Sequence, residues 1–120
     1  MYRIKFYVTV RGDCPFGAFL DAAQPKVKAK FINLLDLLTR LGPDLKRPYA
    51  DSIRDGIREL RVRLGSNRYR ALYFFIMGKT IVITHGILKN SDRVPPEEID
   101  RTLRYRSDLE ERLRRGETTL

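Results

Sequence analysis

Glu59, Arg61 and Arg63 stand at every second position of the segment IRELRVRL (residues 57–64), with leucine and valine between them. Successive side chains of a β-strand point to opposite faces of the sheet, so this pattern predicts one apolar and one cationic face. Guanidinium groups bind phosphate oxygens through paired hydrogen bonds. The chemistry that this strand could support is phosphate binding; the alternative is a solvated strand whose arginines only maintain solubility.

The cations of the chain cluster around this strand. Residues 53–93 contain nine Lys and Arg residues but three Asp and Glu residues, and the whole chain of 120 residues has a formal net charge of +9. Contacts to nucleic-acid backbones come mainly from Lys and Arg. A polyanionic partner is therefore expected, with nucleic acid as the leading candidate and a generic basic surface as the alternative.

Three other side chains are candidates for proton transfer or nucleophilic chemistry. His85, the only histidine, can transfer protons near neutral pH, or it can be a packing residue of a strand. Glu59 can act as a general base, or it can pair with Arg61 and Arg63 and orient them. Cys14 has no neighbouring histidine, which argues against a thiol enzyme. One Cys and one His cannot form a disulfide or the usual zinc ligand set, and we expect neither a metal nor a cofactor.

The strands that must position these residues follow from alternation and turn residues. Strands are predicted over four segments rich in β-branched and aromatic residues: residues 2–10, 57–64, 69–76 and 80–89. The third segment carries Arg70 as its only charge, which is typical of a central strand covered on both faces. In the fourth segment, alternation places Ile81, Ile83, His85 and Ile87 on one face.

Helices are predicted on either side of these strands. The apolar residues of 25–41 recur with a period of 3.6, and a shorter helix is expected over about residues 13–22. A last helix begins at Pro95 and is followed by a frayed tail at residues 116–120. Residues 44–56 have turn composition and are predicted as an irregular connection.

The order of these elements is β-α-α-β-β-β-α, which predicts an α+β fold in a single domain spanning residues 1–120. The sheet is expected to be antiparallel, with the helical hairpin on one face and the opposite face left for function. No segment offers the ~20 apolar residues of a membrane-spanning helix, and no secretory signal pattern is present, so we expect a cytoplasmic protein without a membrane partner.

Several motifs resemble, in their order and spacing, the RelE/HigB superfamily of bacterial toxins, and within it the phage-derived HigB-like branch. They are ELRVR (residues 59–63), YRALYF (69–74), HGILK (85–89) and a proline-initiated helix containing Glu98-Ile99. The resemblance extends over nearly the whole chain, including the order of the elements. It implies a RelE-like fold.

The resemblance also implies an activity and its partners. Members of the superfamily enter the ribosome and cleave messenger RNA, without a metal, by attack of a ribose 2′-hydroxyl on the adjacent phosphate. They are toxins of type II toxin–antitoxin systems. The implied partners are mRNA, the ribosome and a cognate helix-turn-helix antitoxin that holds the toxin in a hetero-oligomer.

Residue roles follow from the matching motifs. Arg61 and Arg63 match basic residues that bind phosphate and favour activation of the 2′-hydroxyl. Arg70 matches the arginine that stabilises charge on the cleaved phosphate, Lys89 matches a basic residue near the leaving group, and His85 can take part in proton transfer. Four more cations are candidates for RNA contacts: Arg58, Arg68, Lys46 and Arg47.

The sequence departs from the family pattern in two places. Asn90 stands where the branch usually has a second lysine, and residues 116–120 contain neither the tyrosine nor the histidine that RelE-like toxins often carry near the C-terminus. The general acid and base therefore stay open. The alternative function is a non-catalytic phage-derived module that binds RNA or protein; a DNA-binding regulator fits less well, because the cations lie on strands. Replacing Arg70 by alanine is expected to remove toxicity at little cost in stability.

Overall fold

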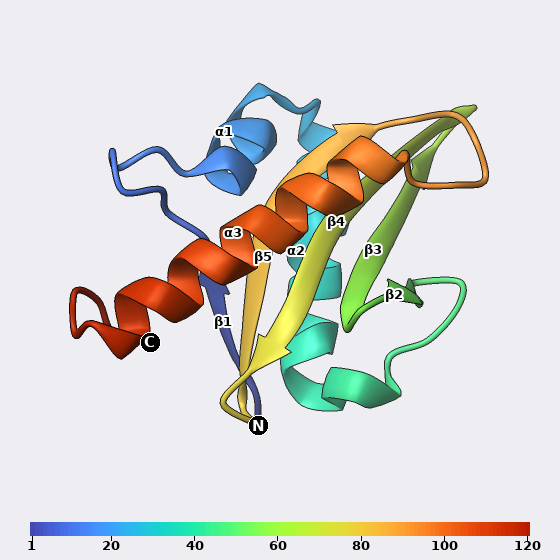
Figure 1. Cartoon of the computed structure of the whole chain (residues 1–120). Coiled ribbons are helices and arrows are strands. Elements are labelled where there is room, and N and C mark those ends of the chain that lie inside the picture. Colours follow the sequence, from blue (N-terminus) through green and yellow to red (C-terminus); the bar gives the residue numbers. More distant parts are fainter.

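The computed structural model describes residues 1–120 as a five-stranded sheet covered by helices on both faces (Figure 1). The strand order across the sheet is β1-β5-β4-β3-β2. The elements, in chain order, are β1 (Arg3–Phe6), α1 (Pro15–Ala22), α2 (Pro25–Leu41), the 3-10 helix η1 (Gly42–Asp44), β2 (Ala50–Arg54), β3 (Ile57–Leu64), β4 (Asn67–Ile76), β5 (Thr80–Leu88) and α3 (Pro96–Arg114). The predicted α+β class is confirmed.

The larger core lies between the sheet and the helical hairpin α1–α2. The predicted bounds of α2 are confirmed, and its buried side chains are those with helical spacing: Val27, Phe31, Leu34 and Leu38. They pack with apolar residues of α1 and with alternate residues of β3, β4 and β5. The periodicity of this helix therefore identified its buried face correctly.

Helix α3 packs on the opposite face of the sheet, so the expectation that this whole face is free for function is wrong. Figure 1 shows α3 crossing in front of the strands while α2 lies behind them. Leu109 is buried against Ile57, Phe74 and Val82, and Ile99 packs with a second small cluster. What α3 leaves uncovered is the part of this face where β3 ends and β4 begins.

Strand β4 is the centre of the sheet, as predicted. It pairs with β3 on one side and β5 on the other. The six residues from Tyr69 to Phe74 are all buried, including Arg70. A charged residue in the middle of this run has to find its partners inside the protein.

Strand β2 is absent from the prediction, which treated residues 44–56 as an irregular connection. Four of its five residues pair with β3, with a register shift at Ile53, and the two strands are joined by a turn at Asp55 and Gly56, both of which have positive φ. Asp-Gly at positive φ is the hairpin turn that matches strand twist. The strand is short and polar because it is an edge strand with one exposed side. β2 pairs with β3 only as far as Leu60, so the end of β3 extends beyond it.

The sheet is mixed rather than wholly antiparallel, because β1 lies parallel to β5, with Ile4 opposite Ile81. Parallel neighbouring strands need a long crossover connection. Here the connection from β1 to β5 contains α1, α2, η1 and the strands β2, β3 and β4. The tail at residues 116–120, expected to fray, folds back on β1. The Lys5 ammonium donates to the carbonyl of Thr119 over 2.8 Å, and Leu120 packs against the α3 cluster.

Strand β5 contains a bulge that changes the face assigned to its second half. Leu72 pairs with His85 while Tyr73 pairs with Ile83, so Thr84 is the extra residue. Ile83 therefore faces α1 and α2, whereas His85 and Ile87 face α3, and the expectation that all three share one face is wrong. A bulge cannot be predicted from period-two alternation, because it inserts one extra residue and so reverses the faces of the residues that follow.

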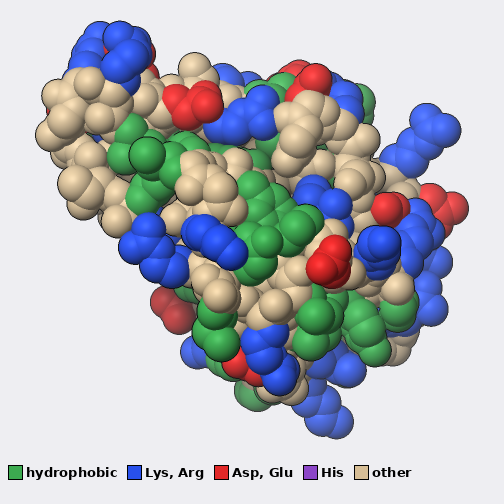
Figure 2. Space-filling model, turned by 90° about the horizontal axis from the view of Figure 1, so that it is seen from below, with side chains coloured by type: hydrophobic (Ala, Val, Ile, Leu, Met, Phe, Trp, Pro, Cys, Tyr) green, Lys and Arg blue, Asp and Glu red, His purple; other side chains and the backbone are tan.

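No helix of this chain combines the length and the apolar character needed to cross a bilayer. Viewed from the end at which the N-terminus lies, the surface carries Lys and Arg side chains around its edge with apolar side chains between them (Figure 2).

The bulge also brings Gly86 under α1, which yields a prediction. A Cβ built on Gly86 would lie 2.4 Å from Cδ2 of Phe19, closer than such atoms approach. Gly86→Ala is expected to lower the free energy of unfolding by about 1–3 kcal/mol, because overpacking forces a side chain or the backbone to move. Urea unfolding measures this. The double variant Phe19→Ala/Gly86→Ala should be less destabilised than the sum of the two single variants, and strict additivity would contradict the proposed clash.

Candidate functional site

The pairing of β3 with β4 places four arginines together on the face that α3 leaves open. Arg61 lies opposite Arg70, and Arg63 lies opposite Arg68. Like charges directly opposite each other on adjacent strands destabilise a sheet. Two such pairs side by side therefore need counter-charges, either from carboxylates of the protein or from an anion.

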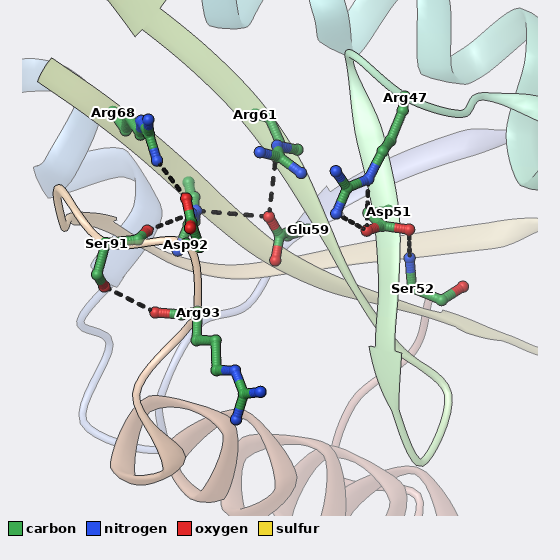
Figure 3. Close-up of polar contacts among 10 residues, drawn as sticks. Arg47, Asp51, Ser52, Glu59, Arg61, Arg68, Ser91, Asp92 and Arg93 are labelled. Atoms are coloured by element: carbon green, nitrogen blue, oxygen red, sulfur yellow. Dashed lines mark hydrogen bonds and ion pairs between the residues drawn. The ribbon is translucent and has the colours of Figure 1, made fainter. Parts of the chain in front are cut away.

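A fifth arginine approaches from the connection between η1 and β2. Arg47, together with these four, lines one pocket of about 370 Å³ whose other lining residues are Pro48, Val62 and Tyr69. In Figure 3, Arg61 lies between Arg47 on one side and Arg68 on the other. Of the candidate residues, Arg61, Arg63, Arg70, Arg68 and Arg47 are thus brought together.

Glu59 is the buried carboxylate of this site. Its Oε1 lies 3.4 Å from Nε of Arg70 and 3.7 Å from Nε of Arg61. Burial raises the pKa of Glu59, and the neighbouring Arg70 and Arg61 oppose that rise. Because one carboxylate touches two guanidinium groups, it can hold both in orientation, which is the pairing role foreseen for Glu59 as an alternative to general base.

Two further carboxylates, both more exposed than Glu59, are counter-ions of the arginine cluster. Asp92 lies 2.7 Å from Nη1 of Arg68, and Asp51 lies 2.8 Å from Nη2 of Arg47. The pKa of each carboxyl group is lowered, chiefly by its hydrogen bond from that arginine. Figure 3 shows these two pairs flanking Glu59. Three carboxylates therefore face five guanidinium groups.

Arg70 retains an unused donor. Its side chain is 1% exposed, its Nη2 donates to the carbonyl of Ser91 over 2.6 Å, and its Nη1 is buried without any hydrogen-bond partner. A buried donor without a partner is costly, and a ligand is one explanation for it. Arg63, in contrast, is exposed and forms no ion pair. The pocket therefore combines one buried and one exposed guanidinium group, each with donors to which an anion could bind.

The loop between β5 and α3 closes one side of the site. Oδ1 of Asn90 accepts a hydrogen bond from the backbone N–H of Arg68 over 2.8 Å, and the Lys89 N–H donates to the Arg68 carbonyl. The contributions of Asn90, Ser91 and Asp92 were not foreseen, since their composition indicates only a loop. The side chain of Lys89 is exposed and does not line the pocket. Arg93 points away from it (Figure 3).

Two of the cations named as RNA contacts lie outside the pocket. Arg58 donates from Nε to the Tyr73 hydroxyl, from Nη1 to Ser52 and from Nη2 to the Leu45 carbonyl, at 2.8–3.2 Å. All its nitrogens are thus used within the protein, and it joins β3 to the segment before β2. Lys46 lines a neighbouring hollow together with Arg47 and Arg58.

His85 lies apart from the arginine pocket, beneath α3. Its side chain is 2% exposed, with Nε2 3.2 Å from Oε1 of Glu98 and Nδ1 3.1 Å from the Thr84 hydroxyl. Burial, aided by the charge of Arg101, lowers the pKa of His85 to about 4. The imidazole is therefore neutral at pH 7 and belongs to the packing between β5 and α3.

The chemistry available in the pocket is electrostatic. Its lining residues include no histidine, and the one tyrosine hydroxyl, of Tyr69, accepts a hydrogen bond from Asn67 over 3.4 Å. No group of three or more His, Cys, Asp and Glu side chains lies together in a way that could hold a metal ion. The arginines can bind a phosphate and stabilise added negative charge on it.

Comparison with known proteins gave a family match and a structural similarity. The sequence matches the family described as phage derived protein Gp49-like (DUF891) over residues 18–106. Among solved structures, the chain is similar to one from the archaeal RelE-RelB complex of Pyrococcus horikoshii OT3, with 20% identity, a TM-score of 0.45, and coverage of 78% of this chain and 98% of that chain. A search of curated proteins gave no match.

The burial of Arg70 changes what its substitution should do. Arg70→Ala leaves Glu59 buried with only the more distant Arg61, so we expect a loss of about 3 kcal/mol in unfolding free energy rather than the small cost expected from an exposed residue. The double variant Glu59→Gln/Arg70→Ala removes the orphaned charge and should recover part of that loss. Urea unfolding of Arg70→Ala, Glu59→Gln and the double variant gives the coupling energy, and a coupling near zero would contradict the pairing.

The burial of His85 predicts an acid-sensitive fold. Because its pKa is about 6.5 when unfolded and about 4 when folded, the unfolded chain binds more protons between these values, and stability falls as the pH drops through this range. Linkage gives a loss of about 2 kcal/mol between pH 7 and pH 5 from this residue alone. In His85→Gln this part of the pH dependence should disappear. Equal pH dependence of the two proteins in urea unfolding would contradict the neutral, buried state.

Proposed function

The chain belongs to the phage-derived Gp49-like family, a family of the RelE/HigB toxin type, and on this premise we propose that it is a messenger-RNA endoribonuclease. In this proposal it is the toxin of a type II toxin–antitoxin system and acts on mRNA in the ribosome. The observation that carries the proposal is the pocket formed by five arginines. A polyanion is the natural ligand of such a pocket, and a chain of phosphates supplies one charge for each nucleotide.

The reaction that suits this pocket is internal transesterification of RNA. The 2′-oxygen of one ribose forms a bond to the adjacent phosphorus while the bond to the 5′-oxygen of the next nucleotide breaks, and the proton of the 2′-hydroxyl is ultimately transferred to that 5′-oxygen. Negative charge increases on the phosphate oxygens in the transition state. Arg70 and Arg61, held by Glu59, would stabilise this charge from fixed positions, which is the most effective form of electrostatic catalysis.

Proton transfer is assigned less easily than charge stabilisation. His85, a candidate from the sequence, is buried beneath α3 and does not line the pocket. Glu59 is the nearest carboxylate to two of the arginines, and its pKa is raised by burial. We propose that Glu59 orients the guanidinium groups. Lys89 is exposed next to the pocket, where it could meet the RNA strand on the leaving-group side.

The proposed partner besides mRNA and the ribosome is a cognate antitoxin with a helix-turn-helix domain, bound in a hetero-oligomer in the cytoplasm. A segment with carboxylate side chains could occupy the arginine pocket in place of phosphate, because it satisfies the same guanidinium groups. A short reading frame next to the gene that encodes such a protein would support this partner.

The second candidate is a non-catalytic module that uses the same pocket to bind RNA or an acidic protein segment. No histidine lines the pocket, so the pocket lacks the usual residue for proton transfer. This favours the second candidate, because arginines that only bind a phosphate do not have to cleave the RNA. The two candidates predict the same binding and differ in whether RNA is cut.

Induced expression with primer extension on cellular mRNA distinguishes them. We expect growth arrest and cleavage inside translated codons with the wild-type chain. Arg61→Ala/Arg63→Ala should lower cleavage by at least about 100-fold, by analogy with loss of a transition-state donor, while stability is retained because the substitutions relieve repulsion across the strands.

Arg104→Ala is the matched control, because Arg104 is an exposed arginine of α3 that forms no ion pair. It should behave as the wild type. Normal growth with intact transcripts on wild-type expression would reject the nuclease and leave the binding module.

A further inference from the structure

A second hollow adjoins the arginine pocket around the edge of β3. Its volume is about 330 Å³, within the usual range of ligand sites. It shares Pro48, Arg61, Val62 and Arg63 with the arginine pocket and adds residues of α2 and the segment before β2: Lys30, Asn33, Leu34 and Tyr49. The two hollows thus form one groove that passes over the part of β3 that β2 leaves unpaired.

The two halves of this groove differ in chemistry. The first half is lined by five arginines and by Tyr69. The second half has two of those arginines, Arg61 and Arg63, at its border with the first, and otherwise contains an exposed aromatic ring, a carboxamide and apolar side chains together with Lys30. No carboxylate lines the second half. A ligand that extends along the groove would therefore place an anionic group in the first half and a flat, uncharged group with polar edges in the second.

The backbone of Tyr49 is held by hydrogen bonds, although the residue is exposed. Tyr49 is 47% exposed and is one of the large apolar residues that lie on the surface. Its backbone carbonyl accepts a hydrogen bond of 2.8 Å from the Arg61 N–H, and its N–H donates to the Lys46 carbonyl over 3.0 Å. The backbone of Tyr49 is therefore fixed beside that of Arg61, and its exposed side chain lines the same hollow as Arg61.

We propose that this second half binds the base of a nucleotide whose phosphate lies in the arginine pocket, with the base stacked on Tyr49. This inference rests on the proposed RNA substrate and deepens it. Every base has a face that can stack on an aromatic ring, and such stacking is a general feature of single-strand binding. The Asn33 amide offers one donor group and one acceptor to the edge of the base, and Lys30 offers a charge to the next phosphate.

Binding of a short oligonucleotide separates the base site from the phosphate site. The probe is a deoxyhexanucleotide, which has no attacking 2′-hydroxyl, and its partner is the same strand with abasic sites. Fluorescence anisotropy measures both with the full chain. Tyr49→Ala should raise Kd for the base-containing strand about 10-fold, equivalent to about 1.4 kcal/mol, and leave Kd for the abasic strand unchanged. Tyr49→Phe, which keeps the ring, should bind as the wild type does.

A fluorescent base gives an independent signal of stacking. With 2-aminopurine placed at each position in turn, one position should show quenched fluorescence that Tyr49→Ala restores. Ile32→Ala is the control, because Ile32 is an apolar residue of α2 with a comparable exposure of 50%, and it should change neither Kd.

The outcomes separate this inference from the proposed function. Arg61→Ala/Arg63→Ala should weaken both strands to the same degree, since it acts on phosphate. Binding of both strands that is insensitive to Tyr49→Ala would overturn the base site and leave the phosphate site standing. Equal weakening of the two strands by Tyr49→Ala would also overturn it, because a stacking ring cannot act on an abasic strand. No binding of either strand by the wild type would overturn the RNA substrate and the base site together.

Discussion

The register between β3 and β4 is the constraint on which the rest of the site depends. It sets Arg61 opposite Arg70 and Arg63 opposite Arg68, an arrangement that is unfavourable without counter-charges. Glu59 lies within 4 Å of two of these arginines and Asp92 pairs with a third. A shift of the register by one residue would send the arginines toward the α1–α2 core. The apolar residues of the same strands therefore hold the charges in place.

Helices on both faces of the sheet determine where such a site can lie. The hairpin α1–α2 buries one face, and α3 covers much of the other. What is left is the end of β3 and the start of β4, together with the edge of β3 beyond Leu60 that β2 does not reach. Arg70 lies at the border of the covered region, which explains why its side chain is buried although it lines the pocket. A guanidinium fixed in this way is preorganised for an anion, because it does not have to be ordered on binding.

Much of the fold could be predicted, and the exceptions have physical reasons. The helix α2 and the strand β3 followed from periods of 3.6 and 2, since burial of one face imposes them. The strand β4 followed instead from its almost continuous apolar run, which is typical of a strand covered on both faces. The strand β2 was missed because an exposed edge strand needs no apolar residues, and its Asp55-Gly56 turn was the one signal available. The bulge at Thr84 places His85 on the face that α3 covers, and no local sequence pattern predicts the inserted residue.

The sequence by itself determined that a cationic strand face exists, because alternation of charged and apolar residues separates them whenever the strand packs. The same alternation indicated that Arg61 and Arg63 belong to that face. The tertiary structure alone decided that, of the four cations named as RNA contacts, Arg47 and Arg68 join the pocket while Arg58 and Lys46 do not. It also decided that His85 is neutral and enclosed, and that Tyr49 lies beside the pocket. These outcomes depend on contacts between segments that are distant in the sequence. The burial of each side chain, and its distance from the pocket, are set only when the helices pack on the sheet.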